Sequence, residues 1–310
     1  MRTETCLLRV SLVVVLALTG CVASRRAPHR IGDSATLRPS AAAPPVVDAE
    51  VEGSRGTAHD GLNATLWMQS AVEYQASARQ AYAAAGQMME QALQDASWTA
   101  ALEQQERADY AQLPPAVILD LDETVLDSSP YMARLVRDDV GYSDATWKAW
   151  VGEAAAQAIP GALEFTRAAA ARGVRVIYLT NRDADEEAAT RINLERLGFP
   201  LGDDPDDVLT QGEIPEWSPR DKGPRRAYVA RSHRILLLIG DNLTDFLSDD
   251  RADMAGRSAL FAQHEARWGR SWIVVPNPLY GSWEAAAYGG NYGLSPEARR
   301  AAKRALLRTR

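Results

Sequence analysis

Six side chains in four short segments of this 310-residue chain could carry out chemistry together. They are two aspartates after one apolar run, a threonine after a second, two aspartates after a third, and a lysine that opens a helical segment: Asp120, Asp122, Thr180, Asp241, Asp245 and Lys222. Carboxylates crowded at strand ends repel one another, so a positive charge should compensate them. Mg²⁺ suits such a site because it binds oxygen ligands and takes only a few carboxylates. The residues therefore predict a Mg²⁺ site that also holds a phosphate, with the lysine and threonine on the phosphoryl oxygens.

The spacing of the acids suggests a division of tasks. Asp120 and Asp122 are two residues apart, so their side chains lie on the same side of an extended strand end. If a cation neutralises only one of them, the two carboxylates can do different work. The alternative for this pair is a solvated turn. For Asp241 and Asp245 the alternative is helix capping, and Lys222 could be an ordinary exposed lysine with nearby arginines in its place.

The elements that must position these side chains alternate between strand and helix patterns after residue 115. Apolar runs predict strands at 116–122, 174–181, 207–210, 234–241 and 271–277. Helix-forming segments with a Gly or Pro near one end predict helices at 160–173, 184–198 and 219–232. This alternation is typical of an α/β fold with a doubly wound parallel sheet. Ligands of such sheets bind beyond the carboxyl ends of the strands, which would bring the six side chains to one edge.

The chain before this region divides into three segments. Residues 1–20 combine two arginines with a short apolar run, which predicts a signal peptide rather than a membrane span. The stretch "LTGC" resembles the lipobox of bacterial lipoproteins, so Cys21 is expected to be lipidated; an ordinary secretory signal with a chance cysteine is the alternative. Residues 21–60 are rich in Ala, Pro, Ser, Arg and Gly and predict a flexible tether. Residues 61–113 predict an N-terminal helical segment, with two helices before the paired prolines.

Composition limits the class of partner. The formal net charge is -7, with 46% hydrophobic and 24% charged residues, so the chain can bury a substantial core. An acidic balance argues against a nucleic acid polymer or an anionic membrane surface as the main partner. A negatively charged substrate would therefore need locally placed cations.

Four motifs resemble those of the haloacid dehalogenase superfamily: "DLDETVLD", "YLTNR", "DKGPRR" and "GDNLTDF". From about residue 62 to residue 292 the chain is similar to the class C acid phosphatase and 5'-nucleotidase lipoproteins of bacterial outer membranes. The resemblance implies a haloacid dehalogenase-like phosphatase core at 114–310, with small helical cap insertions. One departure is Gly223-Pro224, where the family pattern reads DKSxRR; it should alter the helix start and leave the lysine in place.

The resemblance also implies a mechanism. Asp120 attacks phosphorus and forms an aspartyl-phosphate, which splits one difficult displacement into two easier ones. Asp122 protonates the departing alkoxide and then takes a proton from the attacking water. Mg²⁺ would be held by Asp120, the backbone carbonyl of Asp122 and Asp241, with Asp245 beside them. Asn181 and Arg182 are expected to be rim or structural residues.

Aromatic residues in the regions that family members use around the leaving group are Tyr131, Trp147, Trp150 and Tyr280. Stacking on a base or other flat ring is physically sensible, although each of these residues could instead serve packing. The resemblance thus implies hydrolysis of small phosphomonoesters, with nucleoside 5'-monophosphates as the expected substrates. Two alternatives are a ligand-binding surface lipoprotein on the same fold and a phosphotransferase.

The expected location is the bacterial cell envelope, with a lipid anchor in the membrane. Val22 follows the cysteine and replaces the Asp that marks inner-membrane retention in enteric bacteria, which favours the outer membrane. The sequence leaves the oligomeric state open, with a homodimer as one option.

Overall fold

A computed structural model of the protein describes residues 60–107, 109–202, 206–217, 220–248 and 253–310. The expected signal peptide, Cys21 and nearly all of the expected tether lie outside these ranges. The described residues belong to one compact unit, residues 55–310. Among them, no helix has the length and apolar character needed to cross a membrane.

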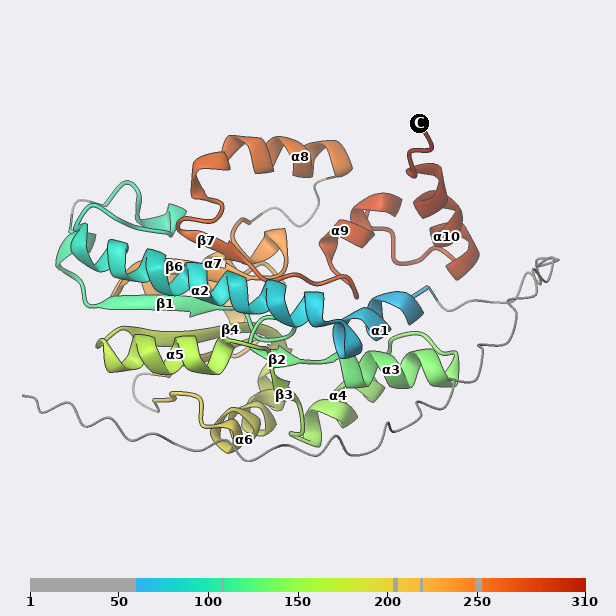
Figure 1. The fold of residues 1–310 in the computed structure, drawn as a ribbon, viewed down its shortest axis with the longest axis horizontal. Coiled ribbons are helices and arrows are strands. Elements are labelled where there is room, and N and C mark those ends of the chain that lie inside the picture. The colour runs from blue at the N-terminus through green and yellow to red at the C-terminus, as the bar shows by residue number, and fades with distance from the viewer. Residues whose placement is uncertain (1–59, 108, 203–205, 218–219, 249–252) are drawn as a thin grey trace, which may run out of the picture. The chain divides into compact units, whose positions relative to one another are not determined.

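Five parallel strands form the central sheet in the order β5-β4-β1-β6-β7 (Figure 1). Their bounds are β1 Pro115–Leu119, β4 Arg175–Asp183, β5 Val208–Gln211, β6 Arg234–Gly240 and β7 Trp272–Val274. The chain runs from β1 outward to β4 and β5, and then returns to the other side of β1 for β6 and β7. The carboxyl edge beside β1, where this order reverses, is the usual position of a ligand site in such a sheet.

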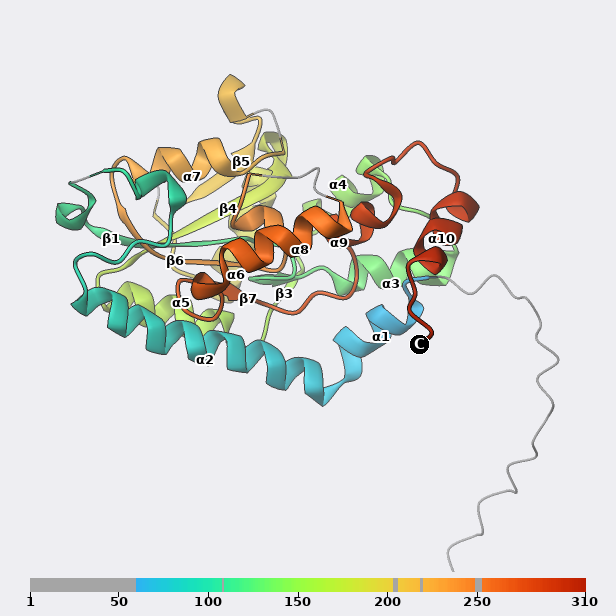
Figure 2. The ribbon, with the colours of Figure 1, turned by 90° about the horizontal axis from the view of Figure 1, so that it is seen from above.

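Ten α-helices accompany the strands within the described residues. Their bounds are α1 Leu62–Ser70, α2 Val72–Gln94, α3 Ser129–Asp138, α4 Asp144–Gly152, α5 Ala162–Ala171, α6 Glu187–Leu197, α7 Gly223–Ala230, α8 Met254–Gln263, α9 Ser282–Ala285 and α10 Pro296–Ala305. Seen from above, α2 and α5 lie on one side of the sheet and α7 on the other (Figure 2).

Alternation along β1 explains these layers. Val117 and Leu119 belong to the apolar cluster that includes α2 and α5, whereas Ala116 and Ile118 belong to the cluster that includes α7. Successive side chains of a strand point to opposite faces, so a strand buried on both faces reads as one continuous apolar run. The N-terminal helix α2 is part of this packing, because Tyr82 is buried within the first cluster.

A small insertion follows β1. The short strands β2 (Leu126–Asp127) and β3 (Gln157–Ala158) pair antiparallel, and the chain between them forms α3 and α4. Both helices lie beyond the carboxyl end of β1 (Figure 1). The insertion therefore forms a cap beside the edge where the candidate side chains gather.

The predicted α/β fold with a doubly wound parallel sheet is confirmed, and the element bounds differ from the expected ones in two informative places. β1 ends at Leu119, because the chain then turns and Leu121 O accepts hydrogen bonds from the three backbone N–H groups of residues 124–126. β7 ends at Val274, where its neighbour β6 also ends: Val275 N donates to the carbonyl of Gly240, the last residue of β6. Helix α7 begins at Gly223, with Pro224 in its first turn, where proline is well tolerated.

Candidate active site

The carboxylates predicted at the ends of β1 and β6 lie together. The hydroxyl of Thr124 is 3.1 Å from Asp120 Oδ2 and 3.2 Å from Asp241 Oδ1, so one side chain bridges the two strand ends. The loop that carries it is tightly turned, and Glu123 has a φ of 61° within it. Such a backbone angle is unusual for a residue other than glycine. The turn holds Thr124 and Asp120 against β6.

Lys222 reaches the same place from the start of α7. Its ammonium group donates to Asp120 Oδ1 and to Asp245 Oδ1, the latter at 2.8 Å. The side chain is only 4% exposed. Asp245 is fixed in turn, because its Oδ2 accepts a hydrogen bond from Asn242 N at 2.8 Å. The lysine is thus a buried cation shared by two of the predicted site carboxylates.

The acid cluster has the geometry and the charge of a cation site. Asp120, Asp241 and Asp245 each offer a carboxylate oxygen, and these atoms all lie within 4.8 Å of one another. Burial raises the pKa of Asp120 to about 6, with Asp245 adding to the effect and Lys222 opposing it. Burial, Asp245 and Asp120 also raise the pKa of Asp241 well above its usual range. One lysine therefore does not neutralise the cluster, and three hard oxygen donors fit a divalent ion such as Mg²⁺.

The carboxylate of Asp122 points to a different partner. Arg182 donates to both of its oxygens, through Nε at 3.1 Å and Nη2 at 2.7 Å. Arg182 is 2% exposed and also donates to Thr190 Oγ1 on α6. We expected a rim or structural residue at this position; the structure buries it against the predicted acid–base residue. The side chain of Asp122 is not in the three-carboxylate cluster, so its predicted contribution to the metal would come from its backbone carbonyl.

Thr180 lies at the carboxyl end of β4, with 1% of its surface exposed. Its hydroxyl accepts a hydrogen bond from Arg182 N at 3.1 Å, and its carbonyl accepts one from Arg225. Arg225 also donates to Asn181 Oδ1 at 2.5 Å. Burial lowers the pKa of Arg225 to about 10, although Asp120 acts in the opposite direction. Arg225 therefore fixes the end of β4 next to the acid cluster.

Three of the four predicted pocket aromatics form one group in the cap. Tyr131 on α3 lies 5.2 Å from Trp147 and 5.9 Å from Trp150 on α4, measured between ring centroids. The two tryptophan rings are 5.1 Å apart, and Trp147 is partly exposed. Arg182 joins this group to the site, because its guanidinium carbon lies 5.7 Å from the Trp147 ring and 5.9 Å from the Trp150 ring.

The fourth aromatic, Tyr280, belongs to a separate arrangement near the acids. Its hydroxyl donates to Glu123 Oε2, while Glu123 Oε1 accepts from the backbone N and the hydroxyl of Ser128. Glu123 is completely buried, and burial raises its pKa to about 8, with a further contribution from Asp122. Tyr280 therefore joins the loop after β7 to the loop after β1.

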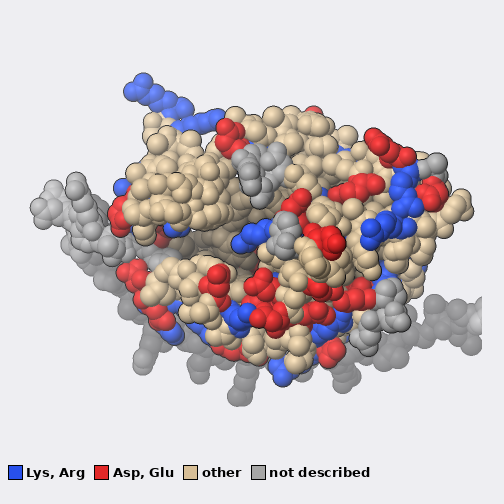
Figure 3. All heavy atoms as spheres, turned by 180° about the vertical axis from the view of Figure 1, so that it is seen from behind, with Lys and Arg blue, Asp and Glu red and all other residues tan. Residues whose placement is uncertain are grey.

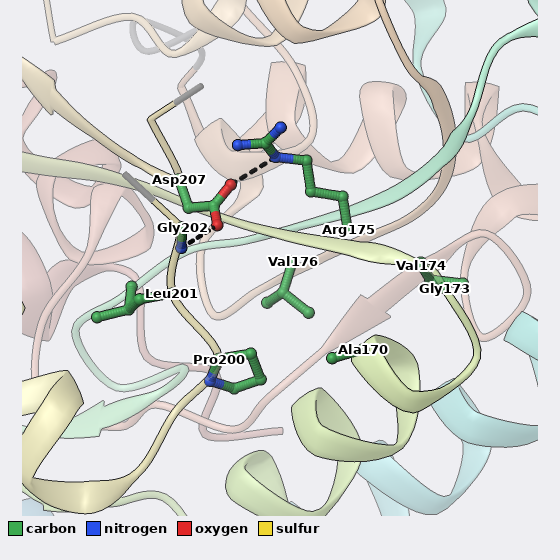
Figure 4. A pocket seen from close by; sticks show the side chains of 9 residues that line it. All are labelled: Ala170, Gly173, Val174, Arg175, Val176, Pro200, Leu201, Gly202 and Asp207. Carbon is green, nitrogen blue, oxygen red and sulfur yellow. Dashed lines mark hydrogen bonds and ion pairs between the residues drawn. The ribbon is translucent and has the colours of Figure 1, made fainter. Parts of the chain in front are cut away.

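A cavity of about 340 Å³ lies at the opposite edge of the sheet (Figure 4). Arg175 and Asp207 line it, and Arg175 Nε lies 2.5 Å from Asp207 Oδ1. The other oxygen of Asp207 accepts a hydrogen bond from Gly202 N. Since Arg175 begins β4 and the candidate residues follow the carboxyl end of that strand, this cavity is separate from the candidate site.

On the face drawn in Figure 3, acidic and basic side chains are interspersed, with acidic ones gathered along its lower part.

Two residues contact the site in ways that the sequence did not predict. Asn277 had no predicted role, and Arg182 was predicted to be a rim or structural residue. Asn277 Nδ2 donates to Asp241 Oδ2 at 2.8 Å. The signal was present in its position, because Asn277 is the first side chain with hydrogen-bonding groups after β7, the same placement that singled out Asp241 after β6. The role of Arg182 could be read only from the fold, since its partner Asp122 is 60 residues away.

A parallel sheet that gathers carboxylates and a lysine at its carboxyl edge has the architecture of the HAD superfamily. The family model described as HAD superfamily, subfamily IIIB (Acid phosphatase) matches residues 55–283. The chain belongs to this family.

Solved structures of an acid phosphatase are similar to this chain, and so are two plant glycoproteins. Two structures of the class C acid phosphatase from Bacillus anthracis, one of them with tungstate bound, are 33% and 32% identical to this chain. Each has a TM-score of 0.70 and covers 81% of this chain and 97% of its own. The Stem 28 kDa and Stem 31 kDa glycoproteins of Glycine max are 27% and 26% identical over 168 residues. These matches cover 53% of this chain and 58% of each relative, so the chain spans less than two thirds of their length.

Proposed function

We propose that this protein is a Mg²⁺-dependent acid phosphatase that hydrolyses small phosphomonoesters, nucleoside 5'-monophosphates among them. The observation that carries the proposal is the buried contact of Lys222 with Asp120, beside two further carboxylates close enough to share one ion. Membership of an acid phosphatase subfamily supports the reaction class. The tungstate bound to the Bacillus anthracis enzyme supports a site for tetrahedral oxyanions, the shape of phosphate.

The proposed reaction proceeds through an aspartyl-phosphate. One carboxylate oxygen of Asp120 attacks phosphorus, an O–P bond forms, and the P–O bond to the leaving group breaks. Asp122 gives a proton to the departing oxygen. It then takes a proton from water, whose oxygen attacks phosphorus and breaks the bond to Asp120. Phosphate is released and both aspartates return to their first state.

The surrounding residues bring charge to a site that a phosphate dianion would otherwise avoid. Lys222 would bind a phosphoryl oxygen, and its hydrogen bond to Asp245 supports this position of the ammonium group. Thr180 lies at the neighbouring strand end and would supply a hydroxyl donor. Bound Mg²⁺, held by Asp120, Asp241 and Asp245 and by the carbonyl of Asp122, would neutralise charge on the phosphoryl group. Arg182 would hold the side chain of Asp122 in a fixed orientation.

Phosphate release from an aryl phosphate tests the proposal. Purified protein should release phosphate with Mg²⁺ and lose that activity in EDTA. Asp120→Asn removes the nucleophile and should abolish turnover, whereas Asp139→Asn, the same change at an exposed position, should leave it intact. If the wild-type protein turned over no monoester between about pH 4 and pH 8, across nucleotides, sugar phosphates and aryl phosphates, a ligand-binding role on the same fold would replace this proposal.

We also propose that the chain is anchored by lipid on Cys21 in the outer membrane of the cell envelope, after removal of residues 1–20. The support is the sequence "LTGC" followed by Val22. Metabolic labelling with an alkyne fatty acid should mark the wild-type protein and not Cys21→Ser. Cys6→Ser is the matched control, because Cys6 would be removed with the signal peptide. Label retained in Cys21→Ser would contradict the anchor.

A further inference from the structure

The loop after β7 contacts the acid cluster through one amide side chain. Asn277 Nδ2 donates to Asp241 Oδ2 at 2.8 Å and to Tyr280 O at 3.1 Å. Its Oδ1 accepts a hydrogen bond from Leu279 N at 2.8 Å. Both ends of the amide are therefore engaged, and its orientation is determined by three hydrogen bonds.

This contact completes the fixation of the Asp241 carboxylate. Oδ1 accepts from Thr124 Oγ1, on the side of Asp120, and Oδ2 accepts from Asn277. A rotation of the carboxylate would break both hydrogen bonds. The amide thus binds one oxygen of Asp241, while the other contacts the threonine that also contacts Asp120.

We infer that Asn277 is a positioning residue for Asp241, whose amide fixes this carboxylate for a divalent cation. The inference rests on the proposed function, since it takes Asp241 as a metal ligand. Groups that hydrogen-bond to metal ligands set the orientation of those ligands, and their removal typically weakens metal binding by about 10–100-fold. Asn277 has the contacts of such a group: its Nδ2 contacts Asp241, while its Oδ1 accepts from Leu279 N.

The same loop has a second attachment that allows a controlled comparison. Tyr280 joins it to Glu123 through the hydroxyl, and this link does not involve Asp241. Tyr280→Phe should therefore loosen the loop at that point while the amide of Asn277 still holds the carboxylate. A role limited to folding the loop would make Asn277 and Tyr280 variants behave alike; a positioning role would separate them.

The experiment measures Mg²⁺ binding by isothermal titration calorimetry and by the shift in thermal unfolding temperature, together with kcat and KM. Asn277→Ser is the main variant, because a serine hydroxyl can still accept from Leu279 N but does not reach Asp241. Asn277→Ala removes both contacts. Asn291→Ala is the control, since Asn291 is exposed and its side-chain oxygen accepts a hydrogen bond from Gly293 N.

In both Asn277 variants, the Mg²⁺ dissociation constant should be about 10–100-fold higher than in wild type. In Tyr280→Phe and Asn291→Ala it should stay within about twofold of the wild-type value. Saturating Mg²⁺ should restore much of the lost kcat. Circular dichroism without Mg²⁺ checks that Asn277→Ser is folded. If the folded variant bound Mg²⁺ with wild-type affinity, the inference would be overturned and the proposed function would stand. An equal loss in Tyr280→Phe would also overturn the inference. A wild-type protein that binds no divalent ion would overturn the proposed function, and the inference with it.

Discussion

Arg182 and Asp122 form a two-point ion pair, with Nη2 2.7 Å from Oδ1 and Nε 3.1 Å from Oδ2. The arginine comes from the end of β4 and the aspartate from the turn after β1, so the pair joins neighbouring strands at the edge that carries the site. Arg182 also lies near Trp147 and Trp150 of the cap. One guanidinium therefore connects the predicted acid–base residue with the aromatic group beside it.

Replacing this arginine should reduce stability strongly. Arg182→Met would leave the Asp122 carboxylate, 15% exposed, without its partner. Breaking a buried ion pair by removing one member costs about 3–5 kcal/mol, because the other charge remains buried and unpaired. Urea unfolding of wild type and Arg182→Met measures the loss in the free energy of unfolding.

A double-mutant cycle shows whether the unpaired charge causes that loss. The double variant Arg182→Met/Asp122→Asn has no unpaired carboxylate at this position. Its loss in the free energy of unfolding should therefore be clearly smaller than the sum of the losses in the two single variants. Additive losses would contradict the ion-pair explanation and would assign the effect to the packing of Arg182 against the tryptophans.

Mg²⁺ binding should become weaker as the pH falls below about 6. The pKa of Asp120 is raised to about 6, chiefly by burial, so near pH 5 this group is mostly protonated in the metal-free protein. Burial also raises the pKa of Asp241, which acts in the same direction. The ion binds carboxylates in their ionised form, so protons must leave when it enters. Affinity should therefore rise by about tenfold per pH unit for each proton released, up to the pKa of the group that releases it.

Calorimetry in two buffers of different ionisation enthalpy counts those protons directly. At about pH 5.5 the wild-type protein should release at least part of one proton per Mg²⁺, and Asp241→Asn should release fewer if it still binds. Equal affinity at pH 5 and pH 7, with no proton release, would show that the carboxylates are ionised before the ion binds.

The buried carboxyl of Glu123 should make the protein less stable as the pH rises. Burial, with Asp122 adding to it, raises its pKa to about 8, above the value of about 4.3 for an unfolded chain. Between these values the folded state holds a proton that the unfolded state has lost. Stability from this group is therefore fully present below about pH 4 and is lost as the pH rises to about 8, at up to about 1.4 kcal/mol per pH unit.

Glu123→Gln isolates this contribution because it keeps the shape and removes the ionisation. From pH 5 to pH 8, the free energy of unfolding should fall more in wild type than in Glu123→Gln, as measured by urea denaturation. Glu195→Gln, the same change at an exposed position, should follow the wild-type slope. Parallel curves for wild type and Glu123→Gln would show that Glu123 is ionised in the folded protein at neutral pH.

Much of the fold and the positions of the strand-end acids could be predicted from the sequence, because both depend on local patterns. Apolar runs bounded by polar residues located all five strands of the main sheet, and the rule that ligands bind at carboxyl ends selected Asp120 and Asp241. The parallel arrangement then required those residues to meet. The cap helices α3 and α4 were expected only as small insertions, since their apolar spacing is short and interrupted.

The side-chain partners could not be predicted in the same way. Asp122 is bound by Arg182, and Asp241 by Asn277, through contacts that depend on rotamers and on how neighbouring loops pack. No spacing in the sequence specifies such contacts. The early end of β7 likewise depends on its neighbour, because the ladder stops at Gly240, where β6 ends.

The cap aromatics lead to a prediction about the leaving group. Trp147 is the partly exposed member of the group with Tyr131 and Trp150, so it has ring surface available for a flat partner. Aromatic contacts are worth about 0.5–1.5 kcal/mol beyond the area they bury. Trp147→Ala should therefore raise the KM for nucleoside monophosphates by about 2–10-fold, while small alkyl phosphates, which have no ring, should keep theirs.

A comparison of substrates separates binding from damage to the fold. Tyr292→Ala is the matched control, because Tyr292 is 66% exposed and its ring contacts Tyr288 rather than the cap group. It should alter neither KM. A loss of activity that is equal for ring-bearing and alkyl substrates in Trp147→Ala would indicate that the tryptophan supports Arg182 and the site as a whole. A loss confined to ring-bearing substrates would assign the leaving-group pocket to α3 and α4, since the chemistry proposed at Asp120 is the same for every monoester.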